Sequence, residues 1–165
     1  METERIRFIR PNIRYVNEML STINDPAVSS LISTREEDYT YEDEVGWIES
    51  NQNGYVFSMI TKDTSEYIGN CGFDELSENY GEIGIFLNPR FQNAGIGTEA
   101  ITKLIRIGFE ELGLEEIRLV VFSHNERAIR CYQRLGFSEY GREYGVAIRD
   151  NQPIDDIYMR LRRWK

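Results

Sequence analysis

The chain has 165 residues, of which 41% are hydrophobic, and a formal net charge of −9, and this length predicts one compact domain over residues 1–165. An acidic surface repels phosphate backbones, so the charge disfavours general nucleic-acid binding. No apolar run reaches the length of about 18 residues that a membrane span needs, and the first residues lack the basic-then-apolar pattern of a signal peptide.

The chain begins with a predicted strand and two predicted helices. Residues 6–10 alternate as a strand does, and apolar side chains then recur at helical spacing over 16–23. The sequence Asn24-Asp25-Pro26 is expected to close that helix. Thr40 is placed to cap the next helix, because its hydroxyl accepts from first-turn amides and the acids at 42–44 suit the positive end of the helix dipole.

Three consecutive strands and a long helix follow. β-branched and aromatic residues predict a hairpin over 55–60 and 67–73, and a third strand over 81–87. The next helix is the clearest in the chain, and Gly113 is placed to end it. Its apolar face is formed by Ile101, Leu104, Ile105, Phe109 and Leu112.

The last third predicts a strand over 117–122, a short helix over 126–135, and two final strands over 137–148 and 154–161. A β-α-β unit in the middle with antiparallel strands around it indicates a mixed sheet.

The loop from Gln92 to Gly97 lies between a predicted strand and a helix expected to start near Thr98. Its glycines allow backbone N–H groups to approach an anion, and the first turn of the helix adds unpaired donors. The loop lacks the lysine of a nucleoside-triphosphate site, since Gly97-Thr98-Glu99 stands where that pattern needs Gly-Lys-Ser/Thr. The preceding strand order also differs from a dinucleotide-binding unit.

Two segments carry a family resemblance. Arg90-Phe91-Gln92-Asn93-Ala94-Gly95-Ile96-Gly97 resembles the acetyl-CoA pyrophosphate loop of the GNAT superfamily, Q/R-x-x-G-x-G/A. The segment from Asn125 to Phe137 is similar to that family's second signature, N-x-x-A-x-x-x-Y-x-x-x-G-F. The resemblance implies an α/β (α+β) GNAT fold: a mixed, mostly antiparallel twisted sheet of about six to seven strands, about four flanking helices, and strands splayed at the cofactor site. The closing segment, with Asp155-Asp156 and Met159-Arg160-Leu161, looks most like the ribosomal-protein N-terminal acetyltransferase (Rim-type) branch, which overlaps in sequence with polyamine and aminoglycoside acetyltransferases.

The resemblance implies acetyl-CoA as co-substrate and no metal. The expected cofactor-binding residues are Ile85, Phe86 and Leu87, acting through their backbone, with Gln92, Asn93, Ala94, Gly95, Ile96, Gly97, Thr98 and Asn125. Phe86 and Leu87 are also expected to pack in the core. Asn125 is equally well placed as a helix cap.

The resemblance also implies the catalytic groups. Tyr132 is the expected general acid for the leaving thiolate, because a phenol stays protonated at neutral pH. Glu82 is the candidate general base, and a water chain is its competitor. His124 is interpreted as a loop residue, and no acyl-enzyme at Cys71 or Cys131 is expected.

The predicted activity is direct transfer of an acetyl group to a primary amine, either a protein N-terminus or a small cationic amine, through a ternary complex. A non-catalytic acyl-CoA-binding module is the alternative from another class. The acidic residues over 36–43 have two interpretations, as helix-capping charge or as a rim that attracts a cationic substrate. Residues considered for the acceptor wall are Tyr39, Trp47, Tyr140 and Tyr144. The two cysteines lack metal-type spacing, which favours a reducing, cytoplasmic setting, and a homodimer is kept open.

Overall fold

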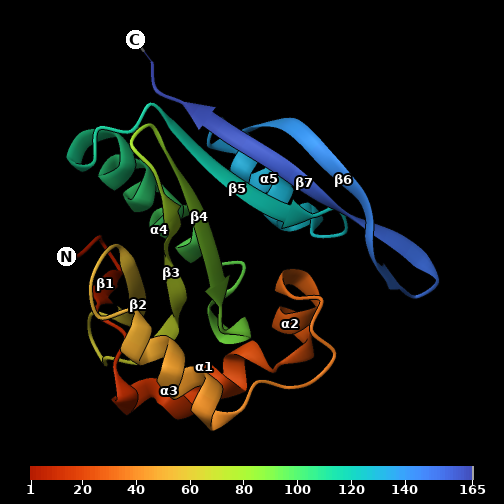
Figure 1. Ribbon diagram of the computed structural model, residues 1–165. Coiled ribbons are helices and arrows are strands. Elements are labelled where there is room, and N and C mark those ends of the chain that lie inside the picture. The colour runs from red at the N-terminus through yellow and green to blue at the C-terminus, as the bar shows by residue number, and fades with distance from the viewer. Residues whose placement is uncertain (165) are drawn as a thin grey trace.

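The computed structural model describes residues 1–164 and contains one seven-stranded sheet in the order β1-β2-β3-β4-β5-β7-β6 (Figure 1). Within these residues β4 and β5 are the only parallel neighbours. The predicted mixed, mostly antiparallel sheet is confirmed. The strands are β1 (Ile6–Ile9), β2 (Val56–Thr61), β3 (Tyr67–Leu76), β4 (Tyr80–Leu87), β5 (Glu116–Phe122), β6 (Ser138–Arg149) and β7 (Gln152–Arg162).

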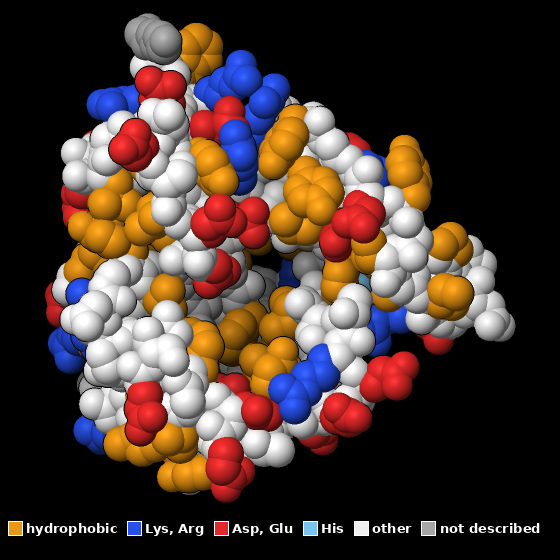
Figure 2. Space-filling view, viewed as in Figure 1, with side chains coloured by type: hydrophobic (Ala, Val, Ile, Leu, Met, Phe, Trp, Pro, Cys, Tyr) orange, Lys and Arg blue, Asp and Glu red, His pale blue; other side chains and the backbone are white. Residues whose placement is uncertain are grey.

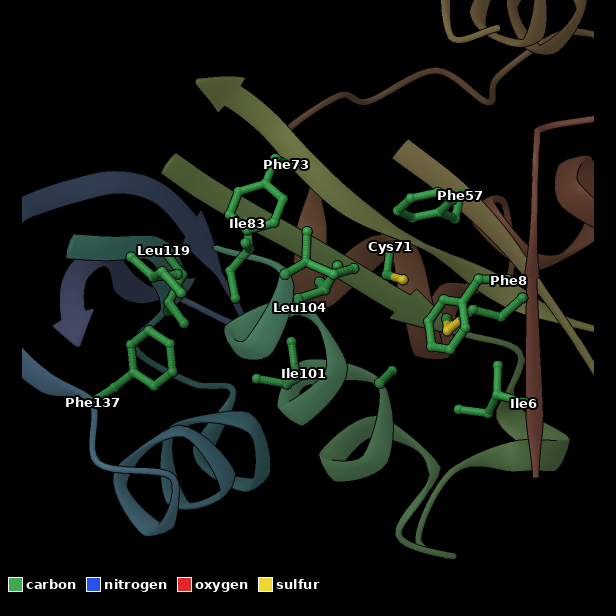
Figure 3. Packing of buried hydrophobic residues seen from close by; sticks show 14 of the residues in the cluster. Ile6, Phe8, Phe57, Cys71, Phe73, Ile83, Ile101, Leu104, Leu119 and Phe137 are labelled. Carbon is green, nitrogen blue, oxygen red and sulfur yellow. The ribbon is translucent and has the colours of Figure 1, made fainter. Parts of the chain in front are cut away.

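Helices cover both faces of the sheet. They are α1 (Val16–Ile23), α2 (Pro26–Ile32), α3 (Tyr41–Ser50), α4 (Ile96–Arg106) and α5 (Glu126–Arg134). Side chains alternate along β2, so that Phe57 and Met59 join the cluster around α4 while Ile60 joins the cluster of α1 and α3. Figure 3 shows Ile101 and Leu104 of α4 in that larger cluster. None of the helices over residues 1–164 combines the length and the apolar character that crossing a membrane requires.

Helix caps confirm two sequence predictions. Thr40 accepts a hydrogen bond from the Asp43 amide at 3.2 Å, and the Asp43 carboxylate accepts from the Thr40 amide at 2.8 Å, which forms a capping box. Gly113 has a left-handed φ of 69° after α4 continues as a π-helical turn over Ile107–Glu111.

The sequence prediction missed helix α2, where we expected only the end of α1. Asp25 accepts a hydrogen bond from the Ala27 amide at 2.9 Å, and Pro26 occupies the first helical position. A proline fits there because that position has no intrahelical partner for its N–H. The Asp25-Pro26 pair therefore ends one helix and starts another.

Candidate active site

Strands β4 and β5 separate soon after they begin. Their parallel pairing ends at Glu82 and Arg118, whereas β4 stays paired with β3 as far as Leu87. Figure 1 shows the two strands diverging, with α2 near the open end. The predicted splay is confirmed, and it leaves backbone N–H and C=O groups along 83–87 for another partner on that side.

The turn after β4 leads into the N-terminus of α4. Asn93 and Gly95 adopt left-handed backbone conformations, with φ of 61° and 79°, and α4 begins at Ile96, two residues earlier than predicted. Gly95 caps the helix without a side-chain hydrogen bond. The first-turn N–H groups therefore remain available to an anion. Arg5 supports this loop, because its Nη1 donates to the Ala94 carbonyl at 2.6 Å.

A cleft of about 320 Å³ connects the diverging strands with this loop. The predicted cofactor residues that line it are Ile85, Phe86, Leu87, Gln92, Asn93, Gly95, Gly97, Thr98 and Asn125. Two of the predicted residues do not line it. Ala94 instead offers its carbonyl to Arg5, and the Ile96 side chain is buried in the core around α4.

Two arginines that the sequence reasoning did not single out add positive charge to the cleft. Arg127 and Arg134 of α5 both line it. Arg127 donates to the side-chain oxygens of Gln92 at 2.9 Å and Asn93 at 3.1 Å, and so ties α5 to the loop. Their i, i+7 spacing places both on one face of α5, which is the signal that the sequence offered.

A second and larger cavity, of about 790 Å³, meets the cleft. Tyr132 and Asn125 line both, together with Leu31, Ile32, Ile85 and Phe86. Asn125 caps α5 by accepting from the Ala128 amide at 3.4 Å, so the cap interpretation is confirmed. Tyr132 packs edge-on against Phe137, and burial raises the pKa of its phenol, which keeps the hydroxyl protonated.

Two carboxylates line the second cavity beside the point where β4 and β5 part. Glu82 is the last residue of β4 that pairs with β5, and burial raises its pKa. Asp74 belongs to a bulge in β3 and lies against Gly84, where an added Cβ would approach its Oδ2 to 2.4 Å. Asp74 is exposed at the mouth of the cavity, and partial desolvation of its carboxyl, with the charge of Glu82, raises its pKa to about 6. The bulge interrupts the alternation of β3, so the sequence pattern gave no sign of Asp74.

Residues 5–138 match the Acetyltransferase (GNAT) domain family. The chain belongs to the GNAT acetyltransferases.

Other GNAT proteins resemble this chain in sequence and in fold. The uncharacterized N-acetyltransferase YoaA of Bacillus subtilis is 35% identical over 97 residues, which are 56% of this chain and 55% of the relative, so the match spans little more than half of that protein. A GNAT-family acetyltransferase from Bacillus anthracis has a TM-score of 0.85 at 22% identity, covering 98% of this chain and 97% of that one. Spermidine N-acetyltransferase from Vibrio cholerae, in complex with CoA and spermine, has a TM-score of 0.83 at 17% identity, covering 97% and 96%. At sequence identities of 22% and 17%, the similarity to these two structures shows the GNAT fold alone.

The remaining sequence candidates divide between the GNAT site and its surroundings. Tyr39 and Trp47 line the second cavity, whereas Tyr140 and Tyr144 do not. Both belong to β6, the outermost strand of the sheet, and Tyr144 is 78% exposed, so a part for them in the acceptor wall stays a prediction. His124 lies with its Nε2 2.9 Å from the Ser30 carbonyl, as a loop residue that contacts α2.

The two cysteines also differ in their surroundings. Cys71 is buried, and burial raises the pKa of its thiol. Cys131 lines the cleft with its Sγ 3.3 Å from the Thr98 hydroxyl.

Proposed function

We propose that this GNAT domain transfers an acetyl group from acetyl-CoA directly to a primary amine through a ternary complex. The observation that carries the proposal is the junction at Tyr132, where the cleft beside the glycine loop meets a second cavity. A donor in one hollow and an acceptor in the other would meet at this side chain. No covalent intermediate on the protein is then needed.

The cleft residues fit the chemical groups of acetyl-CoA. The first-turn amides of α4, with Arg127 and Arg134, provide donors and positive charge for a pyrophosphate. The unpaired backbone of 85–87 offers the strand-type hydrogen bonds that the amides of a pantetheine arm would use. The bound co-substrate supplies the thioester.

Acyl transfer to an amine also needs proton transfers and stabilisation of an oxyanion. A backbone N–H of β4 would donate to the carbonyl oxygen of the thioester. Glu82, with Asp74 beside it, would accept the proton of the attacking amine, and a water chain remains the competing route. Tyr132 would donate its proton to the departing thiolate.

The acceptor is proposed as a protein N-terminus or a small cationic amine, including a polyamine or an aminoglycoside. The spermine bound in the Vibrio cholerae neighbour supports the cationic class. The finer assignment to the Rim-type branch stays a prediction, as do the cytoplasmic setting and a homodimer.

Two measurements test the proposal. Thermal shift should show stabilisation by acetyl-CoA and CoA and none by NAD, and an equal response to NAD would contradict the assigned donor. Release of CoA thiol should then depend on an added amine from a panel of N-terminal peptides, spermidine and aminoglycosides. Binding of acetyl-CoA without thiol release for any amine would favour the non-catalytic acyl-CoA-binding module.

A further inference from the structure

The second cavity collects negative charge that the chain does not neutralise. Glu44, Asp74, Glu82 and Asp156 come from four different elements, and all four line it. Figure 2 shows acidic side chains gathered around a hollow on this face. Within residues 1–164 none of the four carboxylates accepts a hydrogen bond, and burial is the main influence that raises the pKa of each.

Some acids elsewhere in the chain do form ion pairs, and Glu116 is the clearest example. Glu116 has Arg118, Arg160 and Arg162 within 4 Å, at distances of 2.5, 3.9 and 3.1 Å. In the cavity, Arg35 also lines the wall but is already paired with Asp43 at 3.0 Å. Arg118, opposite Glu82 in the strand pairing, partly offsets the charge of Glu82 but forms its salt bridge with Glu116. Within residues 1–164 none of the four carboxylates therefore has a salt bridge of its own.

Glu44 is the most telling of the four. Its side chain belongs to α3 and lines the cavity, yet the residue is only 4% exposed and makes no ion pair with the described residues. The neighbouring Tyr67 hydroxyl is buried without a hydrogen-bond partner, and the charge of Glu44 helps to raise the pKa of Tyr67. A carboxylate buried without a partner is costly, so its position is best explained by a cation that enters from the cavity.

The walls of the cavity suit an alkyl ammonium ion. Tyr39 and Trp47 line it with Val56 and Ile83, which offers apolar surface for methylene groups and aromatic rings for a cation. Glu82 and Asp74 lie where β4 and β5 part, whereas Glu44 lies on α3. The cavity volume of about 790 Å³ also exceeds what a single small amine fills.

We propose that the acceptor is an aliphatic amine with a second positive charge remote from the reacting nitrogen, and that Glu44 binds this second charge. The inference rests on the proposed acetyl transfer. It narrows the acceptor class to diamines and polyamines and makes Glu44 a determinant of specificity with no part in the chemistry.

The test compares diamines with monoamines of the same chain length, such as putrescine with butylamine and cadaverine with pentylamine, by acetyl-CoA-dependent thiol release. In the unaltered protein kcat/KM for each diamine should exceed that for its monoamine by about tenfold, the value of one charged contact. Glu44→Gln should raise KM for the diamines by a similar factor, leave their kcat nearly unchanged, and leave the monoamines unaffected. Glu42→Gln is the matched control, because Glu42 is exposed on the same helix and does not line the cavity.

Equal use of diamines and monoamines would overturn the inference while leaving acetyl transfer intact, and so would a diamine preference that survives Glu44→Gln. A preference for N-terminal peptides over every diamine would overturn it as well. If no amine releases thiol, acetyl transfer itself fails, and the diamine site is then judged by thermal shift. Stabilisation by putrescine that Glu44→Gln abolishes would support the site, and its absence in the unaltered protein would overturn it.

Discussion

Replacing Arg127 by alanine should weaken acetyl-CoA binding about tenfold. Arg127 donates to Gln92 and Asn93 of the glycine loop and lines the cleft. A hydrogen bond to a charged group contributes about 1.5–3 kcal/mol, and the exposure of Arg127 places its contribution near the lower end. A loss of about 1.4 kcal/mol corresponds to a tenfold higher Kd. Calorimetric titration with acetyl-CoA measures it, and the difference between the two proteins should shrink as salt is added.

Arg130→Ala provides the matched control. Arg130 lies one turn along α5, is 61% exposed, pairs with Glu126, and does not line the cleft. Its replacement should leave the Kd for acetyl-CoA within about twofold, because it removes the same charge from the same helix outside the contact region. Equal weakening by the two substitutions would refute a specific contact and would leave only the general charge of α5.

Three further predictions concern the glycine loop, the proposed general acid Tyr132, and Asp74 beside the proposed base Glu82. Gly95→Ala should lower the melting temperature by about 2–4 °C, because a left-handed φ costs a non-glycine residue about 1 kcal/mol. Gly46→Ala is the control and should raise the melting temperature, because Gly46 lies within α3 with open space around it. A shift of the same sign in both variants would contradict the backbone argument. Tyr132→Phe should reduce kcat by about 100-fold or more with little change in acetyl-CoA affinity, measured by thiol release and titration, and equal turnover would remove its role as acid. Because the pKa of Asp74 is raised to about 6, kcat/KM should rise as the pH increases through that value and this carboxyl loses its proton. Asp74→Asn should abolish this rise in kcat/KM. A rise that is unchanged in the variant would show that another group titrates there.

Much of the fold was predictable because it depends on local signals. The capping box at Thr40 and the left-handed stop at Gly113 are set by residues adjacent in sequence. The sequence prediction lacked helix α2 because it took the Asp25-Pro26 pair only as the end of α1, although the same pair can also start a helix. The predicted site therefore lacked the wall of the cleft that Val28 and Leu31 of α2 form.

The site was predictable where a continuous segment carries a recognisable signature, as the loop and the segment from Asn125 to Phe137 do. The loop from Gln92 to Gly97 is continuous in sequence, and its helix N-terminus follows from its glycines. Asp74 and Glu44 reach the second cavity from separate elements, through a bulge in β3 and the packing of α3. No spacing in the sequence links these two residues, because their proximity to the cavity is a product of the tertiary fold.

The most direct test of the central claim is amine-dependent release of CoA from acetyl-CoA by the purified protein, with mass spectrometry of the amine product. We predict thiol release that requires both substrates, initial-rate lines that intersect when both concentrations are varied, and an amine product heavier by one acetyl group. Parallel lines with an acetylated protein would contradict direct transfer, and a protein that binds acetyl-CoA but acetylates no amine would contradict the proposed activity.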